Sequence, residues 1–285
     1  MKTLELTRSA GRAAAAALVL AAGLIAAGSA SAYNTADVPS ATVRYTDLNL
    51  STDAGAHTLY RRIAADPLFD IQQHTWSHRL LKTVHMDDGK SVRVVRGIPL
   101  PEIRTEVLRT SDLIRNVLGK EVTGITGPYN YYRGLRDRPE ILETLYECGI
   151  RFTRCDGRNA QDWHPVSMDL QPYWYDCHGF ADVLEIPIHG WHDCVYREEV
   201  IGWGDLQGYV DSVTPYLDRA AERDEVFSLC QHDWSSIRAD PEMRATEAII
   251  RYAQEHGLRI MTYLDYYQER LAERAAQASL AAVAD

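Results

Sequence analysis

Residues 69–78, FDIQQHTWSH, decide how the middle of this chain folds. A short, mostly apolar run ends here in polar residues, and His74 and His78 follow at a spacing of four. Such a run is typical of a buried strand that leaves a sheet, so we predict a strand over Leu68–Gln73. A helical turn after it would stack both imidazoles on one face, within reach of one zinc ion. The alternative is chance spacing among the chain's ten histidines.

The N-terminus has the pattern of a secretory signal peptide. A positive region, an apolar stretch and a small-x-small cleavage site follow one another at 2–12, 13–27 and 30–32. About 15 apolar residues are too few for a comfortable membrane span, although retention as an uncleaved anchor is the alternative. We therefore expect cleavage after Ala32, export to the periplasm or the extracellular space, and no stable membrane insertion afterwards.

Length and charge narrow the class of protein. Of the 285 residues, about 250 would remain after cleavage, an ordinary length for one α/β barrel. The formal net charge of −10 argues against nucleic acid as a partner, because nucleic acid requires a basic face. The five cysteines show no CxxC spacing and no disulfide framework.

From Leu68 onward, patterns typical of strands and of amphipathic helices alternate. Predicted strands are Leu68–Gln73, Val122–Thr126, Arg151–Cys155, Val183–Ile188, Val226–Gln231 and Leu258–Thr262. Predicted helices are Leu100–Leu118, Arg138–Cys148, Leu206–Arg223 and Pro241–Glu255. This alternation predicts a parallel sheet or barrel, with functional groups at the C-terminal ends of the strands.

The segment 41–65 has a different pattern, a short strand over Thr42–Thr46 and then a helix that Ser51 or Thr52 can cap. Its DLNLS and AGAHTLYRRI runs resemble the N-terminal part of the UrcA family of small exported bacterial proteins. That resemblance implies no chemistry and leaves an interaction protein as a third alternative function.

Motifs further along the chain resemble the polysaccharide deacetylase (NodB-homology) family over residues 68–268. His74-Thr75-Trp76-Ser77-His78 is similar to its metal-binding motif, and Gly127-Pro128-Tyr129 to its Pro-aromatic groove motif. Asp162-Trp163 resembles the pair that lines the acetyl pocket, and Leu229-Cys230-Gln231-His232 resembles the strand end that presents a catalytic histidine. Four short motifs in the family's order are more specific than any one of them.

The resemblance implies an α/β fold, a distorted (β/α) barrel, and a divalent metal, zinc, held by His74 and His78. It implies hydrolysis of acetyl groups, amide or ester, on a sugar polymer. In this interpretation His232 is the catalytic acid, and a carboxylate such as Asp162 orients it. Glycan-binding side chains are expected among residues of the matched motifs and their neighbours, namely Pro128, Tyr129, Trp163, Trp76 and Trp234.

Two features of the family are missing. No Asp-Asp pair precedes His74, and Thr126 stands where the family has an arginine. The pair Asp87-Asp88 follows the motif, and Gly89 beside it predicts a solvated turn. We therefore expect a barrel that is incomplete at its N-terminal β/α units, with Asp47 as a substitute metal ligand. The alternative is a non-catalytic glycan-binding protein or a decayed barrel of the cell envelope.

These observations divide the chain into four parts: a signal peptide, 1–32; a linker with the UrcA-like segment, 33–66; the barrel, 67–270; and an Ala-rich tail, 271–285.

Overall fold

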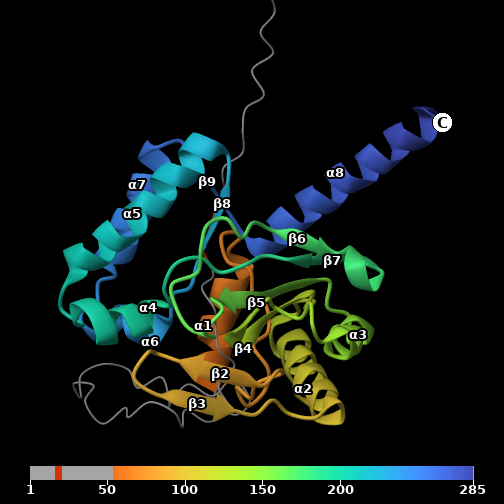
Figure 1. Cartoon of the computed structure of the whole chain (residues 1–285), viewed down its shortest axis with the longest axis horizontal. Coiled ribbons are helices and arrows are strands. Elements are labelled where there is room, and N and C mark those ends of the chain that lie inside the picture. Colours follow the sequence, from red (N-terminus) through yellow and green to blue (C-terminus); the bar gives the residue numbers. More distant parts are fainter. Residues whose placement is uncertain (1–16, 21–53, 285) are drawn as a thin grey trace, which may run out of the picture.

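The computed structural model describes residues 17–20 and 54–284 (Figure 1). Its strands are β1 (Ala17–Leu20), β2 (Val84–Asp87), β3 (Val92–Val95), β4 (Gly124–Tyr132), β5 (Phe152–Arg158), β6 (Tyr173–Tyr175), β7 (Phe180–Glu185), β8 (Val226–Leu229) and β9 (Arg259–Met261). Its α-helices are α1 (Ala54–Ala65), α2 (Leu100–Leu118), α3 (Pro139–Glu147), α4 (Asp193–Tyr196), α5 (Leu206–Arg223), α6 (Asp233–Arg238), α7 (Arg244–Glu255) and α8 (Tyr263–Ala284).

The strands form a distorted α/β barrel. One sheet has the order β4-β5-β7-β6 and another the order β8-β1-β9, and all neighbours in them are parallel except β6 and β7. The chain after β7 joins the two sheets, because His189 N donates to Ser228 O at 2.9 Å. Gln73 pairs in parallel with Ile125 at the opposite edge of the first sheet, and Leu264, just after β9, donates to Asp70. The expected fold class is therefore confirmed.

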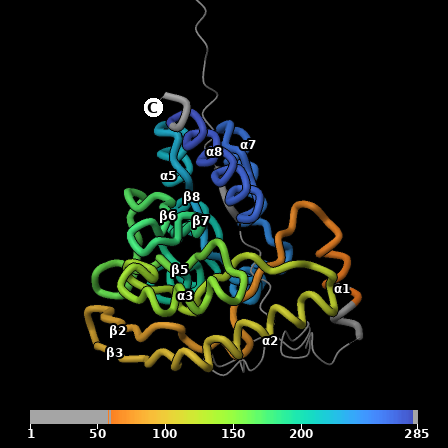
Figure 2. The backbone as a smooth tube through the Cα atoms, turned by 90° about the vertical axis from the view of Figure 1, so that its right-hand side faces the viewer, coloured from red at the N-terminus to blue at the C-terminus, as the bar shows by residue number. Residues whose placement is uncertain are grey.

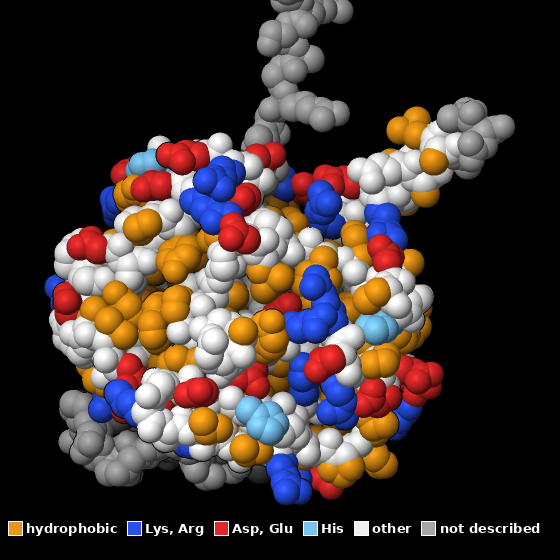
Figure 3. All heavy atoms as spheres, viewed as in Figure 1, with side chains coloured by type: hydrophobic (Ala, Val, Ile, Leu, Met, Phe, Trp, Pro, Cys, Tyr) orange, Lys and Arg blue, Asp and Glu red, His pale blue; other side chains and the backbone are white. Residues whose placement is uncertain are grey.

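Helices flank these strands on two sides. In Figure 1, α5 and α7 lie to the left of the strands, and α2 and α3 to the right. Figure 2 shows α2 and the β2–β3 hairpin on the side opposite to α5, α7 and α8. On the face in Figure 3, basic and acidic side chains are intermixed over the described residues. None of the described helices meets the length and apolarity that a membrane span requires.

The helix α2 has the predicted bounds, and local chemistry explains both ends. It begins after Pro99 with a proline in its first turn, where the missing N–H costs nothing. It ends at Gly119, whose φ of 66° is the left-handed conformation that glycine adopts readily. The predicted apolar stripe is buried at Ile103, Val107 and Ile114. The bounds of α5 are also confirmed, and α7 begins three residues later than predicted.

The predicted strand Leu68–Gln73 is largely wrong, and so is the helical turn after it. Only Gln73 makes a strand bridge, and Thr75 and His78 have positive φ values of 66° and 57°. The reason lies in a side chain: Gln72 Oε1 accepts hydrogen bonds from Thr123 N and Gly124 N at 2.9 and 2.7 Å. The Gln72 side chain therefore binds the N–H groups of Thr123 and Gly124, which would pair with backbone carbonyls if the strand were longer.

The strand β1 lies within the predicted signal peptide. It is paired in parallel between β8 and β9, with Leu20 opposite Leu229. This placement concerns the uncleaved chain, so cleavage after Ala32 stays a prediction. The segment with Asp47 and the strand Thr42–Thr46 lies outside the described residues. The helix predicted to follow it is confirmed as α1.

The predicted tail boundary falls inside a helix. The segment 271–284 continues α8 without a break from Tyr263, and Figure 1 shows this helix projecting away from the barrel.

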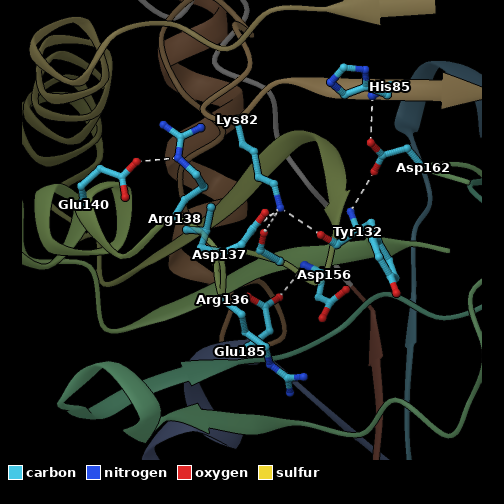
Figure 4. A network of polar contacts seen from close by, with 12 residues as sticks. Lys82, His85, Tyr132, Arg136, Asp137, Arg138, Glu140, Asp156, Asp162 and Glu185 are labelled. Atoms are coloured by element: carbon cyan, nitrogen blue, oxygen red, sulfur yellow. Dashed lines mark hydrogen bonds and ion pairs between the residues drawn. The ribbon is translucent and has the colours of Figure 1, made fainter. Parts of the chain in front are cut away.

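A buried carboxylate lies on β7. Glu185 accepts hydrogen bonds from Cys155 N at 2.6 Å, Asp156 N at 2.8 Å and the Tyr175 hydroxyl at 2.7 Å, and also from the Thr153 hydroxyl. Figure 4 shows Glu185 and Asp156 in one polar network. Burial and, to a smaller extent, the nearby Asp156 carboxylate raise the pKa of Glu185 from 4.5 to about 7.

We predict that Glu185→Gln flattens the pH dependence of folding stability. Because the pKa is raised, the stability from this group is fully present below pH 4.5 and is lost as pH rises to about 7. Between these values the wild-type free energy of unfolding should fall by on the order of 2 kcal/mol more than that of the variant, measured by urea denaturation. Glu121→Gln is the control, since the exposed Glu121 has its pKa lowered by Arg115. Parallel curves for wild type and Glu185→Gln would contradict this.

Candidate functional site

Three of the predicted site histidines meet at the C-terminal ends of the strands. His74 directly follows Gln73, the bridge partner of β4, and its ring centroid lies 4.7 Å from that of His78. His232 follows β8, and its positive charge lowers the pKa of both other imidazoles. His74 and His78 are therefore neighbours, brought together by a loop and not by a helix, and His232 lies near enough to interact with both electrostatically.

His74 is held in the tautomer that a metal ligand needs. Its Nδ1 lies 2.6 Å from Thr126 O, and because a carbonyl oxygen only accepts, Nδ1 carries the hydrogen. Nε2 is then left with a free lone pair. Burial lowers the pKa of His74 well below its usual value and that of His78 to about 4, so both rings are neutral at pH 7. Two neutral, adjacent imidazoles fit a zinc ion.

The carboxylate that holds His232 is Asp193, at the start of α4. Asp193 Oδ1 lies 2.6 Å from His232 Nδ1, and Asp193 Oδ2 accepts from His232 N at 3.0 Å. The Asp193 side chain is fully buried, whereas 23% of the His232 side chain is exposed. Burial by itself would lower the pKa of His232, but the Cys194 sulfur and Asp193 raise it well above its usual value. The pair therefore favours the protonated form of the His232 imidazole.

The sequence suggested Asp162 as the partner of His232, and this assignment is corrected. Asp162 accepts hydrogen bonds from His85 N at 2.8 Å and from Tyr132 N at 3.1 Å, as Figure 4 shows. It therefore ties the β2–β3 hairpin to β4. Asp162 also has a φ of 52°, a conformation that aspartate tolerates better than most residues. These two structural hydrogen bonds account for an Asp at position 162, and no role in proton transfer is needed to explain it.

Asp193, Cys194 and His232 also form a group whose ligand atoms lie within 4.8 Å of one another. Such a group has the composition of a metal site. Both carboxylate oxygens of Asp193, however, already accept hydrogen bonds from His232. Among the described residues, no hydrogen bond involves His74 Nε2, so this nitrogen is able to bind a metal.

Within residues 17–20 and 54–284, no hydrogen bond or ion pair joins a carboxylate to His74 or His78. Asp87 and Asp88 belong to the tip of the β2–β3 hairpin, where Asp88 accepts from Lys90 N and Ser91 N at 2.8 Å. Their interpretation as turn residues is confirmed. A third ligand has to come from elsewhere, and Asp47 stays a prediction.

The predicted glycan-binding residues are not all at the site. The Tyr129 ring lies 5.1 Å from His78 and the Trp234 ring 5.6 Å from His232, so both border the three histidines. The Trp76 ring is instead covered by the Arg109 guanidinium at 3.8 Å. Pro128 is buried next to Tyr129.

Two histidine rings, His164 and His192, lie between Trp163 and His232. Trp163 lies 5.5 Å from His164, which lies 4.2 Å from His192, and His192 is 6.3 Å from His232. These rings form a continuous row that ends at the catalytic candidate. His164 and His192 were not predicted, and both are buried.

The chain resembles known proteins in part of its sequence and in its fold. Residues 37–153 match the family model described as polysaccharide deacetylase. No curated protein sequence matches significantly. The fold is similar to that of a Mycobacterium smegmatis protein assigned to the polysaccharide deacetylases, with a TM-score of 0.54 and 14% identity over 79% of this chain and 70% of that one. At this identity the likeness establishes the fold alone.

Two further structures have a similar fold at low sequence identity. A Pseudomonas aeruginosa PAO1 protein assigned to the polysaccharide deacetylases gives a TM-score of 0.51 and 18% identity over 75% of this chain. The Puue allantoinase gives a TM-score of 0.50 and 15% identity over 74% of this chain. The chain spans 63% and 62% of the lengths of these two proteins. The family match begins at residue 37, so residues 41–65 lie within it, and the predicted resemblance of this segment to the UrcA family is not supported.

Proposed function

We propose that this protein is a metal-dependent hydrolase that removes acetyl groups from a sugar polymer. The observation that carries the proposal is the convergence of the neutral pair His74 and His78 with the Asp193–His232 pair. The family match over residues 37–153 supports the same reaction class. The signal-peptide pattern of residues 1–32 supports export, and with it a glycan of the cell envelope or surroundings as the substrate.

His74 and His78 would hold the divalent metal, zinc, through ring nitrogens. A bound metal of this kind polarises a carbonyl and lowers the pKa of bound water toward neutrality. His74 donates from Nδ1 to Thr126 O, and this hydrogen bond fixes the direction of its lone pair. Asp47 is the proposed third ligand, and it lies within the family-matched range.

His232 would deliver the proton that the departing sugar needs. When the acetyl group leaves, the amine nitrogen or alkoxide oxygen must be protonated. Asp193 favours protonated His232 and fixes its ring through Nδ1, so Nε2–H would be the group that donates the proton. Tyr129 and Trp234, which border the histidines, offer faces for a sugar ring.

We predict that purified protein with zinc or cobalt releases acetate from acetylated chito-oligosaccharides. Acetate would be measured over time with substrate in excess, at pH values near 7. The control is the His74→Ala/His78→Ala chain under the same conditions. Equal acetate release by both proteins, or none by either, would remove the enzymatic proposal for these substrates.

A second candidate is a non-catalytic glycan-binding protein. It is favoured by one observation, that no carboxylate of the described residues contacts His74 or His78 to act as a base. The row of aromatic rings from Trp163 to Trp234 would then serve binding alone. Saturable glycan binding without acetate release at any metal loading would favour this candidate.

A further inference from the structure

Two buried histidines, His164 and His192, face each other from two loops. His164 lies in the segment after β5, and His192 directly precedes α4. An antiparallel bridge between Val166 and Gly190 joins these segments, with N–O distances of 2.8 and 2.9 Å in the two directions. His164 and His192 lie two residues beyond this bridge and are therefore opposite each other on one face of it. Their ring centroids are 4.2 Å apart.

Three ring nitrogens of this pair have no hydrogen-bond partner among the described residues. They are Nδ1 and Nε2 of His164 and Nε2 of His192, in side chains of residues that are 4% and 6% exposed. His189 shows how the same fold pairs a buried imidazole, because its Nε2 lies 2.6 Å from Leu170 O and its Nδ1 accepts from Ser228 N at 3.0 Å. A buried polar atom without a partner is costly, so the three nitrogens indicate a ligand-binding position.

Both rings are neutral and carry lone pairs. Burial is the largest cause that lowers the pKa of His164 and of His192 well below the ordinary value. Each neutral ring then has one nitrogen with a hydrogen and one with a lone pair. The two rings share no N–H···N hydrogen bond, since the three nitrogens have no partner. Neutral imidazoles are ligands of zinc and of its neighbours in the transition series, so a cation is the group that can use both lone pairs.

The surroundings of the pair predict weak binding. The indole rings of Trp163 and Trp191 lie 5.5 and 5.9 Å from the ring of His164 and shield it from solvent. Within the described part of the chain, no third histidine, cysteine or carboxylate has its ligand atom within 4.8 Å of both imidazoles. The positive charge of Arg158 also acts on both rings. An ion with two protein ligands and a positive neighbour is held less tightly than one with three ligands.

We propose that His164 and His192 form a second zinc site, weaker than a site with three protein ligands. Water would occupy the remaining coordination positions, and the ion is expected to leave on dialysis. The site does not rest on the proposed function, because neither ring belongs to the set His74, His78 and His232 that carries the proposed reaction.

The test is calorimetric titration of the full-length, chelator-treated chain with zinc chloride. It is made in the His74→Ala/His78→Ala background, so that heat arises only from other sites. About one zinc per chain is expected to bind. The further change His164→Phe/His192→Phe keeps a ring in both positions and removes the nitrogens. It should raise the dissociation constant by about tenfold or more, because both protein ligands are lost.

The single variants His164→Phe and His192→Phe should show the same loss, so the prediction remains testable if the double change prevents folding. His178→Phe is the matched control, since His178 Nε2 lies 2.6 Å from Arg136 O and does not belong to the pair. It should leave zinc binding unchanged. Equal zinc affinity with and without the two imidazoles would overturn the proposal. Zinc binding that depends on the pair, in a wild-type chain that releases no acetate, would support this site while removing the proposed function.

Discussion

His74→Ala/His78→Ala is expected to abolish stoichiometric metal binding and to lower acetate release by about 10³-fold or more. A metal centre stabilises transition-state charge by several kcal/mol, so its loss has an effect of this size. Structural and catalytic zinc sites have at least three protein ligands, and removal of two leaves too few. Metal content after dialysis, by mass spectrometry, should fall from about one ion per chain to nearly none.

His256→Ala provides the matched control for this prediction. His256 is exposed at the end of α7, where its ring stacks on Tyr252 at 4.0 Å. It should change neither metal content nor acetate release. Unchanged metal in the double variant would show that the metal binds elsewhere, with Asp193, Cys194 and His232 as the remaining described candidates.

Asp193→Asn is expected to lower kcat by about 10²-fold or more, a typical contribution of a positioned acid. An amide has no charge to stabilise the imidazolium, and its NH₂ group competes for the orientation of His232. The pH dependence of kcat should also change, because Asp193 raises the pKa of His232. The loss of protonated His232 with rising pH should therefore move to lower pH in the variant.

Asp162→Asn is expected to lower the stability of the fold and to leave catalysis nearly unchanged. Asp162 accepts two backbone hydrogen bonds, so the variant should lose about 1 kcal/mol of stability while kcat stays within about twofold of wild type. If instead Asp162→Asn lowers kcat strongly and Asp193→Asn does not, the assignment of the orienting carboxylate is wrong.

The elements with strong local signals could be predicted from the sequence. An amphipathic stripe and a C-terminal glycine determine α2, and both are visible in residues 100–119. Parallel topology also places the C-terminal ends of β4 and β8 at one edge of the barrel, and His232 directly follows this edge after β8. These predictions depend only on neighbouring residues and on the handedness of the fold.

The partner of His232 could not be predicted in this way. Asp162 lies in the loop after β5, and Asp193 begins α4 after the loop that follows β7. The path of such a loop depends on tertiary contacts. The placement of Asp193 beside β8 depends on its own N–H, which donates to Cys230 O at 3.3 Å. The run His189-Gly190-Trp191-His192-Asp193 after a predicted strand was the available signal. The strand predicted over 68–73 failed for a related reason, since the Gln72 side chain replaced backbone pairing.

The neighbour of Thr126 on the next strand could not be predicted either. Arg154 lies opposite Thr126 because β5 pairs in parallel with β4, and Arg154 Nη1 donates to Thr126 Oγ1 at 3.3 Å. Such a pairing is a property of the folded sheet and is not visible in either segment alone.

We propose that His74 and His78 hold the metal and that His232 lies near both of them. The most direct test of this proposal is an anomalous difference map from crystals of the zinc-loaded protein, recorded at the zinc absorption edge. We expect one strong peak within bonding distance of His74 Nε2 and a ring nitrogen of His78. A peak at Asp193, Cys194 and His232, or no peak at the two histidines, would contradict it.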